Sequence, residues 1–139
     1  MRARRTTALT LGILLLCLAA CDDDDTFGPP LFDLTLGIRS FNPHVGQLFE
    51  VRVVDRGTGL EVARQRVAPI ASPDFDLYFD EVLIQGRDYN VDFYADANDS
   101  GGYDAPPVDH AWRLPVTEVR GDISLVFPHD FVWTDIQFP

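Results

Sequence analysis

The sequence contains no lysine, because all 11 of its basic residues are arginines. This absence excludes chemistry that needs a lysine amine, such as Schiff-base formation, a Walker-type phosphate site or a Lys–Asn isopeptide bond. Glutamate is also scarce, with 4 residues against 18 aspartates. Because Glu favours helices whereas Asp favours turns and caps, this imbalance argues against a helical protein.

Cysteine occurs only at Cys17 and Cys21, both near the N-terminus. Arginines at positions 2, 4 and 5 precede an apolar stretch over residues 8–18, and small residues follow at positions 19 and 20. These are the parts of a secretory signal. The apolar stretch is shorter than the about 20 residues that a membrane-spanning helix needs. We therefore expect residues 1–20 to be a signal peptide that is removed.

The four residues Leu18-Ala19-Ala20-Cys21 resemble the lipobox of bacterial lipoproteins. The resemblance implies that the Cys21 thiol receives a diacylglyceryl group and that cleavage frees its amine for further acylation. More than one acyl chain is needed for stable anchoring. We expect a lipid anchor in the cell envelope, facing the periplasm or the cell surface. Asp22 resembles the inner-membrane retention signal of enterobacteria-like systems, but the inner and the outer membrane both remain open.

Without residues 1–20 the chain has eight arginines and 22 acidic residues, a formal net charge of −14. Nucleic acids and anionic lipid headgroups require a basic surface, so neither is expected as a direct partner. Residues 21–30 (CDDDDTFGPP) are the expected linker, since adjacent like charges repel and prolines stiffen the chain. Residues 31–139 are sufficient for one hydrophobic core.

From Leu31 onward, apolar and polar residues alternate, and turn residues interrupt the alternation at regular intervals. No segment has a helical period. The pattern predicts an all-β fold, a single antiparallel Ig-like or prealbumin-like sandwich of seven or eight strands in residues 31–139. It directs Asp92 and Tyr94 outward. The predicted strands are Leu31–Arg39, Leu48–Asp55, Leu60–Ile70, Phe75–Val82, Tyr89–Ala95, Ala111–Val116, Ile123–Phe127 and Phe131–Phe138.

Residues 75–104 contain a strand, a Gly-x-x-Tyr step at residues 86–89, and a second strand that ends in a D-x-N-x-x-G loop beginning at Asp96. This order is similar to that of prealbumin-like (transthyretin-like) and carboxypeptidase-regulatory-like sandwich domains of exported bacterial proteins. The resemblance implies a domain that binds or scaffolds and rarely catalyses.

The loop that begins at Asp96 also has the alternating oxygen donors of a calcium site. Pro107 stands where such a loop carries a bidentate glutamate, so Asp109 would have to substitute. A hairpin loop stabilised by Asx turns is the alternative interpretation. The candidate calcium ligands are Asp96, Asn98, Ser100, the carbonyl of Gly102, Asp104 and Asp109.

His110 and Trp112 share one face of a predicted strand beside this loop, and together with Tyr94 they form a predicted ligand patch. A core tryptophan with a histidine at the sheet rim is the alternative. The histidines at positions 44, 110 and 129 share no metal-type spacing, so the sequence gives little support for zinc.

We therefore expect a non-catalytic envelope module that holds a partner protein or glycan near the membrane, with no residue assigned to catalysis. The sequence leaves its oligomeric state undetermined. Two alternatives remain open: a small hydrolase that uses the acidic-loop carboxylates with His110, and a structural lipoprotein that associates with copies of itself.

Overall fold

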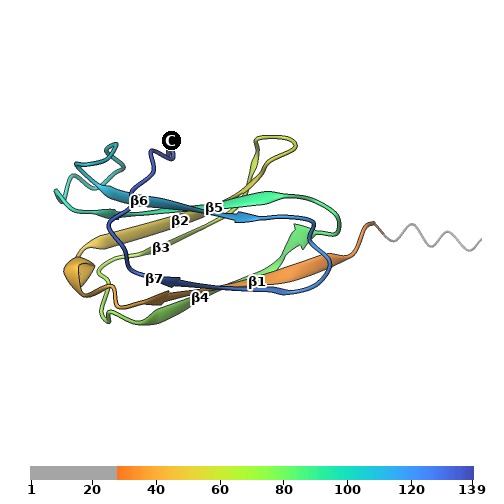
Figure 1. Ribbon diagram of the computed structural model, residues 1–139, viewed down its shortest axis with the longest axis horizontal. Helices are drawn as coiled ribbons and strands as arrows, with labels where there is room; N and C mark the ends of the chain where they lie inside the picture. The colour runs from red at the N-terminus through yellow and green to blue at the C-terminus, as the bar shows by residue number, and fades with distance from the viewer. Residues whose placement is uncertain (1–27) are drawn as a thin grey trace, which may run out of the picture.

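The computed structural model describes residues 28–139 as two packed β-sheets (Figure 1). One sheet has the strand order β4-β1-β7 and the other β3-β2-β5-β6. The predicted signal peptide, Cys21 and most of the predicted linker lie outside the described residues. The elements are β1 (Leu31–Arg39), the 3-10 turn η1 (Asn42–His44), β2 (Leu48–Asp55), β3 (Glu61–Val67), β4 (Phe75–Ile84), β5 (Tyr89–Asp96), β6 (His110–Val116) and β7 (Ile123–Pro128).

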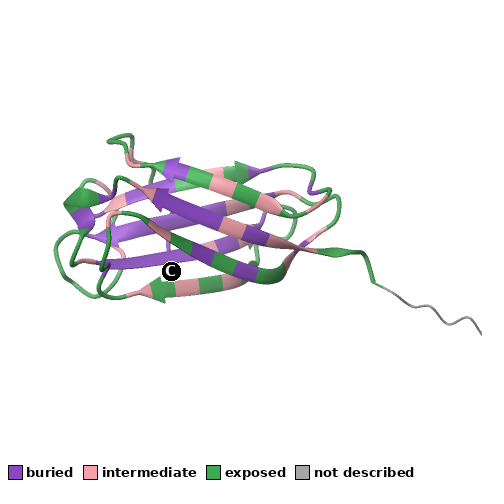
Figure 2. Cartoon of the chain, turned by 90° about the horizontal axis from the view of Figure 1, so that it is seen from below, coloured by how far each residue is buried: buried purple, intermediate pink, exposed green. Residues whose placement is uncertain are grey.

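The alternating apolar residues form the core between the sheets. Val51 pairs with Phe93 and Val53 pairs with Val91 across β2 and β5, and all four are fully buried. Buried residues concentrate in β1, β2 and β5, whereas β3 and the turns at both ends of the sandwich are largely exposed (Figure 2). The all-β sandwich predicted from the sequence is confirmed, with seven strands. Within residues 28–139, no helix has the length and hydrophobicity that crossing a bilayer requires.

One strand pair departs from the predicted antiparallel arrangement. β7 lies parallel to β1, with Leu36 opposite Leu125 and Ile38 opposite Phe127. The chain reaches β7 from β6, which belongs to the other sheet. Because residues 117–122 cross between sheets and do not form a hairpin, the connection leaves β7 free to run in the same direction as β1.

The predicted strand over Phe131–Phe138 is wrong. This segment, which we call the C-terminal strap, is irregular and crosses the outer face of the four-stranded sheet. Ile136 and Phe138 are buried against that face, which explains the alternation of the sequence without a strand ladder. Asp92 and Tyr94 point outward as predicted, yet each is only 1% exposed because the strap covers them.

The two ends of the sandwich carry different segments (Figure 1). The chain enters β1 at the end that we call proximal, where the Gln85 amide donates to the Pro30 carbonyl. The turns at residues 56–60, 85–88 and 117–122 also lie there. The opposite, distal end carries η1, the acidic loop of residues 97–109 and the start of the strap.

Candidate functional site

Asp96 and Asn98 organise the first half of the acidic loop through hydrogen bonds with the loop itself. The two Asp96 carboxylate oxygens accept from the amides of Ser100 (3.0 Å) and Gly101 (2.7 Å). The Asn98 Oδ1 also accepts from the Ser100 amide (3.2 Å), and its Nδ2 donates to Asp104 Oδ2 (2.9 Å). Several candidate calcium ligands therefore share one loop, where they form the Asx turns of the alternative interpretation.

Asp109 closes the second half of the loop. It is fully buried, and its carboxylate accepts from the amides of Ala97 (2.9 Å) and Asp104 (2.7 Å). Burial raises the pKa of Asp109, and the two amide donors oppose that rise. The Ser100 hydroxyl donates to the Gly102 carbonyl at 3.1 Å. The loop therefore ends in a fixed carboxylate directly before His110, the first residue of β6.

Three histidines that are remote in the sequence meet at the distal end. His44 ends η1, His110 begins β6, and His129 follows β7. The His44 Nε2 lies 3.2 Å from the His129 Nε2 and 3.4 Å from the His110 Nδ1. We call these three residues the histidine cluster.

His44 is the buried centre of the histidine cluster, with 1% of its surface exposed. It is positioned by η1, which contains Pro43, and by its own amide, which donates to the Phe41 carbonyl (3.0 Å). The His44 Nδ1 lies 2.7 Å from the Gln47 Oε1. Because that oxygen only accepts, the His44 proton sits on Nδ1, and the Nε2 lone pair faces the other two imidazoles.

The imidazoles of the histidine cluster are uncharged at neutral pH. Burial lowers the pKa of His44 to about 4; its hydrogen bond with Gln47 opposes the shift, and the charged forms of its two neighbours add to it. Burial also lowers the pKa of His110 and that of His129. All three rings therefore present nitrogen lone pairs rather than positive charge.

Aromatic rings enclose the histidine cluster. Trp133 of the strap stacks on His110, with ring centroids 3.9 Å apart and an interplanar angle of 16°. The Trp112 ring lies 5.8 Å from the rings of both His44 and His129. These are the two tryptophans of the chain. His44 is thus held in an apolar shell, whereas His110 and His129 are partly exposed at its edge.

The predicted ligand patch is divided between the two faces of the four-stranded sheet. His110 and Trp112 lie together on the inner face, with ring centroids 6.4 Å apart. Tyr94 lies on the outer face, where its ring is 5.0 Å from that of Phe138 and its hydroxyl donates to Glu50 Oε2 (3.0 Å). The structure therefore brings the first two residues together and separates Tyr94 from them.

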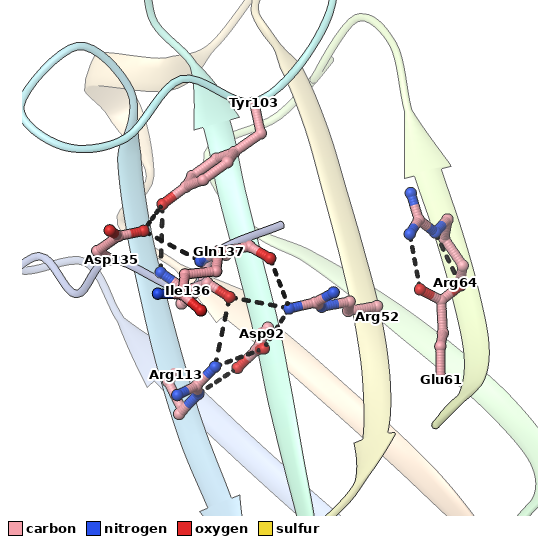
Figure 3. A network of polar contacts seen from close by, with 9 residues as sticks. All are labelled: Arg52, Glu61, Arg64, Asp92, Tyr103, Arg113, Asp135, Ile136 and Gln137. Carbon is pink, nitrogen blue, oxygen red and sulfur yellow. Dashed lines mark hydrogen bonds and ion pairs between the residues drawn. The ribbon is translucent and has the colours of Figure 1, made fainter. Parts of the chain in front are cut away.

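A buried carboxylate fixes the strap on the outer face of the sheet (Figure 3). Asp92 accepts from Arg113 Nε at 2.6 Å and from Arg52 Nη2 at 3.2 Å. The Arg52 Nη2 also donates to the Ile136 carbonyl at 2.8 Å. Because Asp92 is almost inaccessible to water, its charge is compensated by the two guanidinium groups, which in turn bind the strap backbone.

The strap is also tied to the acidic loop through Tyr103. Its hydroxyl donates to Asp135 Oδ1 (2.8 Å) and accepts from the Ile136 amide (3.2 Å), as Figure 3 shows. Phe138 packs against the Arg64 guanidinium, which lies 4.6 Å from its ring centroid. The acidic loop therefore contacts the strap through Tyr103, and the strap contacts the histidine cluster through Trp133.

Sequence reasoning missed the histidine cluster because its members are 66 and 85 positions from His44. A usable signal lay in the predicted strands. His44 follows the end of one strand, His110 precedes the start of another, and His129 follows the end of a third. Strand direction places these three positions at the same end of a sandwich. Comparison with protein-family models, with curated proteins and with solved structures gives no match.

The strap network predicts that Asp92→Ala lowers the free energy of unfolding by about 3 kcal/mol, because two guanidinium groups lose their buried counterion. Asp76→Ala is the matched control: it removes a carboxylate paired with Arg39 (2.7 Å) at an exposed site, and should cost about 0–1 kcal/mol. Denaturant unfolding measures both changes, and hydrogen exchange of the Ile136 amide should accelerate only in Asp92→Ala. Equal losses in the two variants would contradict the role given to Asp92.

Proposed function

We propose that the protein is a non-catalytic binding module, held to a membrane of the bacterial cell envelope by acyl chains on Cys21. Its partner is a protein of the periplasm or the cell surface, bound at the distal end. The lipobox resemblance supports the anchor, and the prealbumin-like resemblance supports a domain that binds or scaffolds. The main support is that the chain enters β1 at the proximal end, whereas η1, the acidic loop and the start of the strap lie at the distal end.

The linker enters the sandwich at the proximal end, so a lipid on Cys21 would leave the distal end as the part farthest from the anchor (Figure 1). β1 has nine residues, and a strand rises about 3.3 Å per residue, so the two ends are about 30 Å apart. An acidic spacer followed by a rigid sandwich suits a module that displays its distal loops away from a bilayer.

Apolar side chains at the distal end support a protein partner. Phe131 and Val132 are 73% and 75% exposed, the highest values among the exposed large hydrophobic residues described. Val45 beside η1 and Val108 in the acidic loop are about half exposed. These four residues lie on segments at the same end of the sandwich, and large contiguous apolar patches are typical of protein-interaction surfaces. We call these four residues the distal apolar surface.

The hydrolase alternative has less support from the geometry. The carboxylates of Asp96 and Asp109 accept hydrogen bonds from backbone amides, and the Nδ1 of His110 contacts His44. Neither carboxylate is paired with His110 in a way that would make it a general base.

We also propose calcium as a stabiliser of the acidic loop, since the side-chain oxygens of Asp96, Asn98 and Asp104 lie in one short acidic segment. Their oxygens retain lone pairs beyond those used by the loop amides. Calcium should raise the melting temperature of the protein by several degrees relative to chelator, and Asp104→Asn should reduce the rise. Superimposable melting curves with calcium and with chelator would remove the ion from the proposal.

Substitution of the anchor residue should release the protein from the membrane. Cys21→Ser is expected to abolish palmitate labelling and to move the protein from the membrane fraction to the soluble fraction, because the acylated thiol is lost. Cys17→Ser, in the apolar stretch of the signal, is the matched control and should leave both properties intact. Membrane retention of the Cys21→Ser protein would contradict the lipid anchor.

Charge placed on the distal apolar surface should abolish partner binding. We expect Phe131→Asp with Val132→Asp to eliminate the hetero-complex formed on crosslinking in intact cells, since burying two carboxylates in an apolar interface is costly. Leu60→Asp, at a site that is 66% exposed in a proximal turn, is the control and should preserve the complex. A complex that persists in the double variant, or one that contains only copies of this chain, would overturn the proposed function.

A further inference from the structure

We propose that the histidine cluster is a transition-metal site that takes Zn²⁺ or Cu²⁺ through His44 Nε2, His110 Nδ1 and His129 Nε2. The inference does not depend on the lipid anchor or on the distal apolar surface. It rests on three features of the histidine cluster: the spacing of the nitrogens, the hydrogen bonds available to His44, and the contact between His44 and Gln47.

The spacing of the ring nitrogens matches that of ligands on one ion. Zinc binds imidazole nitrogen at about 2.0–2.1 Å with tetrahedral angles, which separates two ligand nitrogens by about 3.3–3.4 Å. The distances from His44 Nε2 to the other two nitrogens are 3.2 Å and 3.4 Å. Two edges of a three-nitrogen coordination set therefore already have the required length.

Hydrogen bonding alone leaves the histidine cluster incompletely satisfied. The His44 Nδ1–H donates to Gln47 Oε1, so the Nε2 of His44 offers a single lone pair to two neighbouring ring nitrogens. One neighbouring ring nitrogen can donate a hydrogen bond to that lone pair in good geometry. The lone pair is then used, and the second neighbouring nitrogen faces it without a hydrogen bond. A cation at this point would accept all three lone pairs at once.

Gln47 supplies the outer-shell contact that metal-binding histidines usually have. Ligating histidines generally donate their second ring N–H to a carbonyl or carboxylate, which fixes the tautomer and the ring orientation. The His44–Gln47 contact at 2.7 Å has this form.

The third edge of the set has to close when the ion enters. As the rings stand, residues 28–139 hold no three His, Cys, Asp or Glu side chains already arranged around one point. His110 and His129 are both only partly buried, and rotation about their ring torsions is the adjustment required. His44 is the fixed member, and the other two close on it.

The ligand set selects the class of metal. Three neutral imidazoles suit zinc, copper and nickel, whereas calcium and magnesium require oxygen ligands. Copper(II) binds such nitrogen sets most tightly among the divalent first-row ions. Three protein ligands also leave one coordination position open for water or for an outer ligand.

The tryptophans provide a direct readout, since both lie against the histidine cluster. Titration of the purified full-length protein with Cu²⁺ should quench its fluorescence saturably at one ion per chain, and Zn²⁺ should compete. Electron paramagnetic resonance of the Cu²⁺ form should show nitrogen couplings from three imidazoles. Absence of saturable quenching by Cu²⁺, together with no Zn²⁺-dependent rise in melting temperature, would overturn the proposal.

Variants separate this site from adventitious binding. His110→Gln and His129→Gln should each weaken Cu²⁺ binding more than Gln47→Leu, which removes only the orienting contact and should cost about 10–100-fold. His44 is left unchanged because it is buried. Asp88→Asn alters a carboxylate of the proximal turn at residues 85–88, at the opposite end of the sandwich, and should bind Cu²⁺ as the unmodified protein does. Equal affinity in the unmodified protein and both histidine variants, or loss of binding in Asp88→Asn, would overturn the assignment.

Discussion

The compensation of Asp92 by Arg52 and Arg113 is the interaction on which the distal half of the molecule depends. A carboxylate buried to this extent is tolerated only when opposite charges and hydrogen bonds replace water. The guanidinium groups that provide this compensation also bind the Ile136 carbonyl. The charge of one strand residue thereby anchors a strap that has no regular secondary structure of its own.

The strap in turn completes the environment of the histidine cluster. It carries Trp133 onto His110, and its Thr134 amide donates to the Ala111 carbonyl at 2.8 Å beside the same strand end. On the other side, the buried Asp109 fixes the acidic loop at the residue before His110. Two independent restraints therefore hold the strand end that carries His110, while η1 and Gln47 position His44.

The two ends of the sandwich, which the strands connect, carry different features. Its chain enters at the proximal end, and the acidic loop, the distal apolar surface and the histidine cluster all occur at the other end (Figure 1). With the proposed anchor on Cys21, this arrangement would separate membrane attachment from the proposed partner binding. A metal at the histidine cluster would lie beneath Phe131, whose ring is 4.9 Å from that of His129, so occupancy of the metal site and shape of the distal apolar surface would be coupled.

Alternation of apolar residues determined the fold class, the seven strands and the residues that fill the core, because a strand places successive side chains on opposite faces. The same alternation gave a wrong strand prediction for Phe131–Phe138, where Ile136 and Phe138 pack on a sheet without joining its hydrogen-bond ladder. Only the tertiary structure decided that β7 pairs in parallel with β1, that Asp92 and Tyr94 are covered, and that His44, His110 and His129 meet. Those outcomes depend on strand order and on the ends at which distant segments arrive, which a local period of two residues does not encode.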